Sequence, residues 1–368
     1  MAHNKNQHFV PQFLLKNFSV NENRKSIHCY NLGHNRLIEN ASIKGQAQSE
    51  NFYGKGFNVD EALTRSEQIA SVVIRKIITT NKLPNYGTDD YACLHIFVMM
   101  KAIRTKAFQD EINDSVDKHV KAIIKHDKRF QGEIFEKLLE GHKFIIENAV
   151  SQFISRSIDR LQLTYDLKCK LVINESKLPF LISDNPVARY NQFLKRKNEE
   201  SGTTGFACLG LQIILPISPR HCLVFYDADI YNFGQKNYDF IKLKHDSQVK
   251  IFNLFQIFSA DQNVYFNQFI DTNYIQNLIK IINHHRNNEK NTIYEYQHAG
   301  GSQRTLLHIS GNELNAKMQL PFFIETKRAN KYVLGDKVVH LRDHPNYILM
   351  KEDEEKFKND GELPNLLK

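Results

Sequence analysis

The chain has 368 residues, of which 41% are hydrophobic and 24% are charged; these proportions are typical of a folded protein and exclude a disordered one. Its net charge of +8 favours approach to phosphate-rich partners, although plentiful Lys, Asn and Ile with no Trp are also what a biased base composition would produce. The five cysteines form no CxxC pair, the start is polar and no apolar run approaches about 18 residues, so we expect a cytoplasmic protein without a membrane segment.

The first part of the chain is predicted to be mainly helical. A short helix begins near Pro11, and residues 27–32 and 36–43 flank a glycine-containing turn, which indicates a β-hairpin. Apolar residues at helical spacing then predict helices from about 58 to 158. Within this stretch, residues 88–90 read Thr-Asp-Asp, which is typical of a helix N-cap.

The pattern changes after about residue 160, where strands are expected. Alternation of apolar and polar residues, or short apolar runs between turn residues, predicts strands at 161–173, 179–182, 206–217 and 222–226. Helical spacing returns at 246–266 and 272–285, and two further strands are expected at 318–324 and 332–339.

Strands that are grouped after a run of helices favour segregated layers over alternating βαβ units. We therefore expect an α+β fold in which a helical part (58–158) packs on a mostly antiparallel sheet (160–226), with covering helices at 246–285. Residues 1–290 are expected to form the main domain, and 291–368 a C-terminal extension.

Two motifs carry a family resemblance. Residues 8–18 read HFVPQFLLKNF, and residues 183–186 read SDNP after an apolar run. The chain resembles the family catalogued as domain of unknown function 4238, whose members open with HxxPxxxLxxF and later carry a strand that ends in SDxP. The resemblance spans about residues 7–285, implies no activity, and departs from many relatives at Lys106, where they continue with proline. It extends to Phe52-Tyr53, Glu67, Arg104-Thr105, the LPISP segment at 215–219 and Asn253.

His8, Gln12 and Asp184 are the candidate catalytic residues. His8 lies just before the helix that begins near Pro11, where a side chain can point toward an anion or a metal, and Gln12 can share its face. Asp184 ends an apolar strand, a position from which loops build sites. The alternatives are a buried, hydrogen-bonded His8 and an Asp184 that caps a turn by accepting backbone N–H bonds.

A divalent metal ion, magnesium or manganese, is the candidate cofactor, with Asp184, Glu50 and Glu67 as its candidate ligands. Glu67 lies on a predicted helix, with Arg104 in the neighbouring one. The alternative for Glu67 is therefore an ion pair with Arg104 that bridges two helices.

A basic surface is predicted on the later helices, where cationic residues recur at helical spacing. The alternative is a solvated face that keeps the helix soluble. The candidate binding residues are these cations, Lys118, Lys121, Lys125, Lys128 and Arg129, and the motif residues Arg104 and Asn253.

Several standard catalytic patterns are absent from the sequence, namely GxxxxGK[ST], GxGxxG after a strand, GxSxG and HExxH. A basic chain with candidate His, Asp and Glu groups fits metal-assisted or general acid/base phosphodiester cleavage. We therefore expect an enzyme that processes DNA or RNA, a nuclease of the defence or toxin effector type. The alternative is a non-catalytic sensor that binds nucleic acid or a protein partner.

Overall fold

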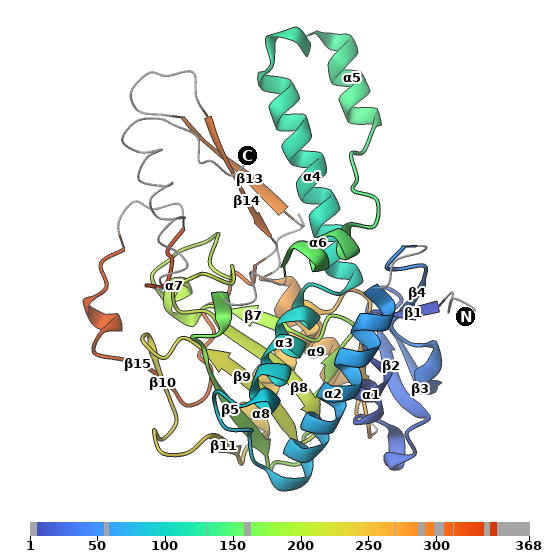
Figure 1. The fold of residues 1–368 in the computed structure, drawn as a ribbon, viewed down its shortest axis with the longest axis vertical. Coiled ribbons are helices and arrows are strands. Elements are labelled where there is room, and N and C mark those ends of the chain that lie inside the picture. Colours follow the sequence, from blue (N-terminus) through green and yellow to red (C-terminus); the bar gives the residue numbers. More distant parts are fainter. Residues whose placement is uncertain are drawn as a thin grey trace.

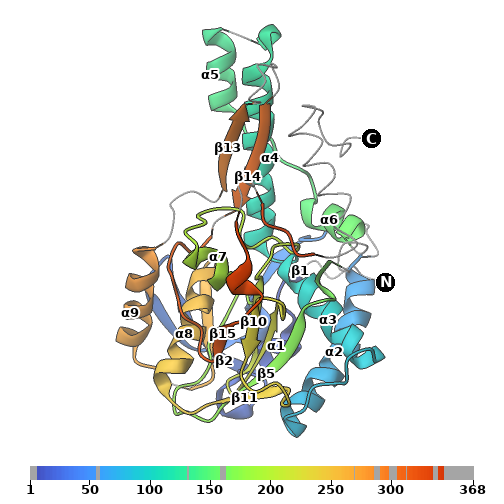
Figure 2. The same cartoon turned by 90° about the vertical axis from the view of Figure 1, so that its left-hand side faces the viewer.

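The computed structural model describes residues 6–54, 59–130, 132–157, 163–268, 270–285, 291–297, 305–311, 313–334 and 339–343. It confirms the α+β class, because helices cover sheets whose strands are mostly antiparallel. Figure 2 shows the layers, with α2 (Val59–Thr80) and α3 (Asp89–Ala102) on one side of the sheets and α8 (Asp246–Ser259) and α9 (Thr272–Asn283) on the other.

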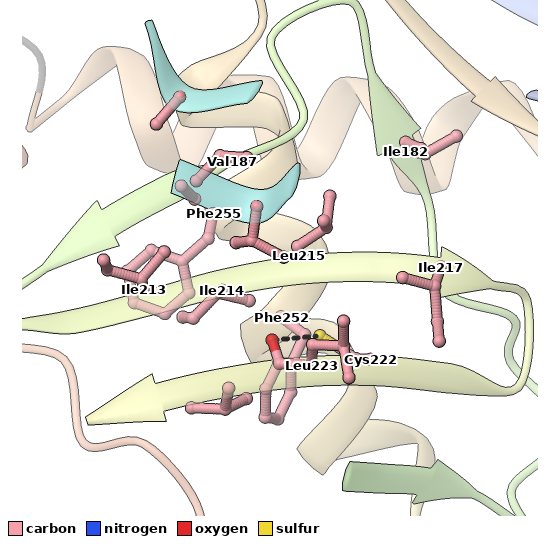
Figure 3. Packing of buried hydrophobic residues seen from close by; sticks show 14 of the residues in the cluster. Ile182, Val187, Ile213, Ile214, Leu215, Ile217, Cys222, Leu223, Phe252 and Phe255 are labelled. Atoms are coloured by element: carbon pink, nitrogen blue, oxygen red, sulfur yellow. Dashed lines mark hydrogen bonds between the residues drawn. The ribbon is translucent and has the colours of Figure 1, made fainter. Parts of the chain in front are cut away.

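The central sheet has the strand order β11-β5-β9-β8-β7, and only the β11–β5 pair is parallel. Every residue of β8 and β9 is buried because helices cover both faces of this sheet. Figure 3 shows the packing, in which side chains of β8 and β9 meet Phe252 and Phe255 of α8. The strands are β5 (Lys168–Asn174), β7 (Ala188–Tyr190), β8 (Gln212–Ser218), β9 (His221–Tyr226) and β11 (Phe240–Leu243).

A second, antiparallel sheet has the order β3-β2-β12-β6. The predicted hairpin is confirmed as β2 (Ser26–Asn31) and β3 (Arg36–Ser42). The helix predicted for 246–266 is wrong at its end, because α8 stops at Ser259 and β12 (Asn263–Phe266) inserts between β2 and β6 (Ile182–Ser183).

Three predicted strands are longer than the observed ones, for local reasons. Residues 164–167 form a turn before β5, and a φ of 75° at Gly210 interrupts extended structure before β8. Leu181 gives its N–H to a side chain of α8 instead of a strand, which leaves β6 with two residues. Residues 158–162 lie outside the described part of the chain.

The helical part continues into an arm, which we define as α4 (Lys106–His126) and α5 (Glu133–Gly141). Figure 1 shows the arm rising from the body beyond α6 (Ala149–Ser157). The antiparallel ribbon of β13 (Asn291–Gln297) and β14 (Thr305–Gly311) lies along α4 in both views. Asn291 fastens it there by donating to the Glu111 carbonyl at 2.8 Å.

Residues 313–334 pack on the main domain. β15 (Phe323–Glu325) pairs with β10 (Tyr231–Phe233), and the rings of Phe323 and Phe233 stack at 3.9 Å. The strand predicted for 318–324 is thus shorter and begins later, while residues 332–334 are not a strand and residues 335–338 lie outside the described part of the chain. Further short elements include α1 (Gln12–Lys16), α7 (Gln192–Arg196), β1 (Asn6–His8) and its partner β4 (Gln48–Glu50). Within the described residues, none of the helices combines the length and the apolar character that crossing a membrane requires.

Candidate functional site

A polar pocket of about 430 Å³ lies where the N-terminal motif meets the helical part. Its walls come from β1, α1, α2 and the segment that follows α3, and only Phe13 and Leu63 of its lining residues are apolar. Four motif residues that are far apart in sequence therefore share one cavity. They are His8, Gln12, Glu67 and Arg104.

His8 is fixed at the end of β1 by hydrogen bonds at both ring nitrogens. The Gln12 amide nitrogen lies 2.8 Å from His8 Nε2, and His8 Nδ1 lies 3.1 Å from the Gln46 carbonyl oxygen. An amide nitrogen only donates and a carbonyl only accepts, so these partners assign the neutral ring with its proton on Nδ1. The lone pair of Nε2 therefore points toward the amide of Gln12, which also lines the pocket.

Arg104 lies just after α3 and is 4% exposed. Its Nε donates to the Tyr53 hydroxyl at 2.9 Å, and its Nη2 donates to Glu67 Oε1 at 2.6 Å. Burial alone would lower the pKa of Arg104, but Tyr53 and Glu67 raise it above its ordinary value. The ion pair that bridges the two helices is thus present, and it holds a charged guanidinium at the pocket wall.

Lys101 lies one helical turn before Arg104, behind the pocket wall, and is 1% exposed. Its Nζ donates to the carbonyl of Phe9, the residue that follows His8. Burial, together with the nearby Arg104, holds the pKa of Lys101 well below its ordinary value, while Glu67 acts in the opposite direction. Lys101 does not line the pocket itself but holds the backbone next to His8.

Asp184 does not line this pocket. It is 4% exposed, and its carboxylate accepts the backbone N–H groups of Asp261, Gln262 and Asn263 at 2.8 to 2.9 Å. Burial raises the pKa of Asp184 to about 6, and the three N–H groups oppose that rise. The expected cluster of His8, Gln12 and Asp184 is not formed in this pocket, and Asp184 takes the turn-capping position.

Asn253, a candidate binding residue, is fully buried in α8. Its side chain accepts the Leu181 N–H at 2.9 Å and donates to the Pro179 carbonyl at 3.0 Å. These bonds tie the segment before β6 to the covering helix. Asn253 therefore does not present its amide at the pocket, whose lining lies on other elements.

The Arg-Thr pair connects the pocket with the SDNP motif. Arg104 lines the pocket, whereas the adjacent Thr105 hydroxyl donates to Asn185 Oδ1 at 2.9 Å. Asn185 in turn donates to the Ser259 carbonyl at the end of α8 at 3.0 Å. The motif residues thus form a connected network, in which Asp184 and Asn185 fasten the fold and Arg104 faces the cavity.

The proposed metal ligands are separated. Glu67 lies in the pocket as the partner of Arg104, Asp184 holds the turn, and Glu50 is exposed on β4 and does not line the pocket. Within the described residues, no three His, Cys, Asp or Glu side chains are grouped so that they could hold a metal ion. This donor set does not fit a magnesium or manganese site, which needs several free oxygen ligands.

The predicted basic surface lies on the arm, where much of its charge is paired. Lys118 contacts Asp114 at 3.2 Å, Lys121 contacts Asp117 at 2.9 Å and Arg129 contacts Asp127 at 2.6 Å. Lys125 is exposed, and the side chain of Lys128 lies outside the described part of the structure. The paired charges resemble the solvated-face alternative more than a phosphate-binding surface.

Three residues of the site were missed in the sequence. Lys101 interrupts an apolar helix three positions before Arg104, a spacing that places both on one buried face, so its position was a usable signal. Gln7 accepts the Tyr53 N–H at 2.7 Å, and Lys16 adds a cation to the pocket lining. Lys16 follows Gln12 by four positions, the spacing that also links Gln12 to His8, so its position was a usable signal too, whereas the role of Gln7 depends on the pairing of β1 with β4.

The model of a family described as Protein of unknown function (DUF4238) matches residues 6–269. This range contains all lining residues of the pocket as well as the Asp184 turn. No curated protein matches the chain, and no solved structure matches it.

Proposed function

The chain belongs to this family of proteins of unknown function, and we propose from its pocket that it processes nucleic acid, holding a phosphate group beside His8. One observation carries the proposal. Arg104 is buried and oriented by Tyr53 and Glu67, yet its Nη1 has no hydrogen-bond partner among the described residues, and the side chain lines the pocket.

A guanidinium held in this way suits a phosphate. With Nε and Nη2 engaged by Tyr53 and Glu67, the N–H groups of Nη1 are the donors left for a phosphate oxygen, and such a charge-assisted hydrogen bond is strongest where water is partly excluded. Because Tyr53 and Glu67 already fix Arg104, little side-chain freedom is lost when an anion binds. Lys16, at the end of α1, supplies a second cation in the same lining.

His8 is the proposed proton-transfer group. Its Nε2 holds a lone pair in the lining of the pocket, where Gln12 donates to it. In phosphodiester hydrolysis, Nε2 would take a proton from the attacking water as Gln12 rotates away, and it would return that proton to the leaving oxygen as the phosphorus–oxygen bond breaks. No step is assigned to a metal ion, and magnesium or manganese stays a candidate cofactor that the test below addresses.

Cleavage of nucleic acid is a chemistry by which a defence or toxin effector acts, and we propose that role for this protein. The second candidate function is binding of a phosphate-bearing partner without catalysis. It is favoured by the two hydrogen bonds of the His8 ring, which are also what a purely structural histidine would make.

The test uses the full chain with single-stranded RNA, single-stranded DNA and plasmid, each with EDTA, magnesium or manganese. We expect cleavage of at least one substrate that persists in EDTA and falls by about 100-fold or more in His8→Ala. His34→Ala, at an exposed hairpin residue, is the matched control and should leave the rate unchanged. Binding that needs Arg104 without any cleavage would support the second candidate, and cleavage only with an added metal would overturn the assignment to His8 alone.

A further inference from the structure

The tip of the arm carries large apolar side chains that are exposed. Ile134 is 79% exposed and Ile123 is 58% exposed, and Phe130 and Phe135 are each about 40% exposed with ring centroids 5.7 Å apart. These four residues, which we call the tip cluster, come from the end of α4, the turn after it and the start of α5. An exposed group of this kind, far from the body in Figure 1, marks an interaction surface more often than chance.

The charge around the tip cluster is divided between the two helices. Residues 118–130 contain five Lys or Arg and one acidic residue, whereas Glu133–Gly141 contains three Glu and one Lys. Within the described side chains, no ion pair joins α4 to α5, because Arg129 pairs with Asp127 and Lys137 pairs with Glu133. The exposed Lys125 of α4 and the exposed Glu136 and Glu140 of α5 have no ion-pair partner among the described side chains, so each helix has unlike charge to offer to another molecule.

We infer that the tip cluster is a self-association surface through which two copies of this chain pair about a two-fold axis. A two-fold axis places the same patch on both sides of the interface, so the patch must be self-complementary. At the arm tip, the basic end of α4 of one copy would face the acidic α5 of the other, with the tip clusters packed between them. The inference does not depend on the proposed function.

Pairing through the arms would also act on the pocket. α4 begins directly after Arg104-Thr105, and Thr105 is its N-cap residue, whose side chain accepts the Phe108 N–H at 3.2 Å. A partner that immobilises α4 would therefore also immobilise its first turn, which lies next to Arg104 at the pocket.

The test is the mass of the full chain in solution, measured by sedimentation velocity over a range of concentrations. We expect a monomer–dimer equilibrium whose dissociation constant rises at least about tenfold in Ile134→Glu, since an apolar side chain that is mostly exposed in the monomer contributes mainly to association. Val333→Glu is the matched control, because Val333 is 89% exposed and lies outside the arm. A chain that stays monomeric, or a dimer that Ile134→Glu leaves unchanged, overturns the inference.

Charge exchange gives a second and independent readout. Glu136→Lys with Glu140→Lys should weaken the dimer by placing like charges opposite each other, and adding Lys121→Glu with Lys125→Glu should restore it. Restoration in the fourfold variant requires that α4 and α5 meet across the interface. If the fourfold variant associates no better than the double variant, the two-fold arrangement is wrong.

Discussion

At the scale of single residues, the motifs divide into two tasks. Arg104 and His8 face a cavity, whereas Asp184, Asn185 and Asn253 hold backbone together. Burying a polar side chain without hydrogen-bond partners costs free energy, so each of these residues needs either a ligand in the cavity or bonds to the backbone. The sequence motif alone fits both tasks equally well. The hydrogen bonds decide between the two tasks for each residue.

Asp184→Ala should reduce stability. The substitution removes the carboxylate that accepts three backbone N–H groups, those of Asp261, Gln262 and Asn263, in a part-buried turn. We expect the free energy of unfolding to fall by about 1–3 kcal/mol. Urea unfolding measures this decrease, and phosphate-ligand binding by the folded fraction should be unchanged.

Asp261→Ala is the control for that prediction. Asp261 lies in the same turn, but its side chain accepts no hydrogen bond in the described residues, and the change should stay within about 0.5 kcal/mol. A stable Asp184→Ala variant that has lost only its activity would show that Asp184 belongs to a reaction centre after all.

His221 makes the fold sensitive to acid. Its Nδ1 lies 2.8 Å from the Ser218 hydroxyl and its Nε2 lies 2.7 Å from Asn81 Oδ1, an arrangement that suits the neutral ring. Burial lowers the pKa of His221 to about 4, whereas the unfolded chain keeps a pKa of about 6.5. As the pH falls, the unfolded state takes up the proton first, so stability present above pH 6.5 is lost between about pH 6.5 and 4.

The measurement compares the free energy of unfolding of the native chain and His221→Gln at several pH values. We expect the native chain to lose on the order of 2 kcal/mol more than the variant across this interval. His34→Gln, at an exposed position, should follow the native curve. Parallel curves for the native chain and His221→Gln would contradict the role given to this histidine.

At the scale of elements, the sequence correctly predicted those helices and strands whose formation depends on residues close together in the chain. The hairpin of β2 and β3 and the helices α2, α3 and α4 follow from turn residues, caps and apolar spacing. β12 was predicted as helix because its run of apolar residues fits both periods, and its strand form depends on pairing with β2, more than 200 positions earlier. His8, Gln12, Glu67 and Arg104 were all named from the sequence, but for different roles, and their meeting in one pocket depends on tertiary packing.

The segment 313–334, part of the predicted C-terminal extension, illustrates the same dependence on distant partners. Glu313 is 6% exposed and accepts from both Thr203 and Thr204, while Lys195 Nζ contacts it at 3.2 Å. Glu313→Gln would leave the buried Lys195 without its counter-charge, so we expect a decrease of about 3 kcal/mol in the free energy of unfolding.

The matched control for Glu313→Gln is Asp229→Asn. Asp229 and Arg328 also join this segment to the body, at 2.9 Å, but both side chains are more than half exposed. Exposed pairs contribute little, so this change should cost at most about 1 kcal/mol. Equal costs for the two variants would mean that Glu313 is not the residue that anchors the segment.

At the scale of the whole molecule, the net charge of the chain and the pairing of its individual charges lead to different predictions of which surface binds nucleic acid. The chain carries a net charge of +8, yet three of the cations that were expected to bind phosphate are paired with Asp on the arm. The pocket, by contrast, holds Arg104 and Lys16 with Glu67 as the partner of Arg104. Specific binding of nucleic acid should therefore depend on the pocket, and the arm should add little.

The salt dependence of nucleic acid binding tests this division. Each phosphate that a cation neutralises releases condensed counterions, so the slope of log K against log salt becomes less steep by about 0.7 for each single-strand phosphate that is no longer neutralised. We expect Lys16→Ala to lower affinity and to reduce the slope by about that amount. Lys121→Ala with Lys125→Ala, which removes two charges from the arm, should change neither quantity. If the arm variant reduces the slope and Lys16→Ala does not, the arm and not the pocket is the surface that contacts phosphate.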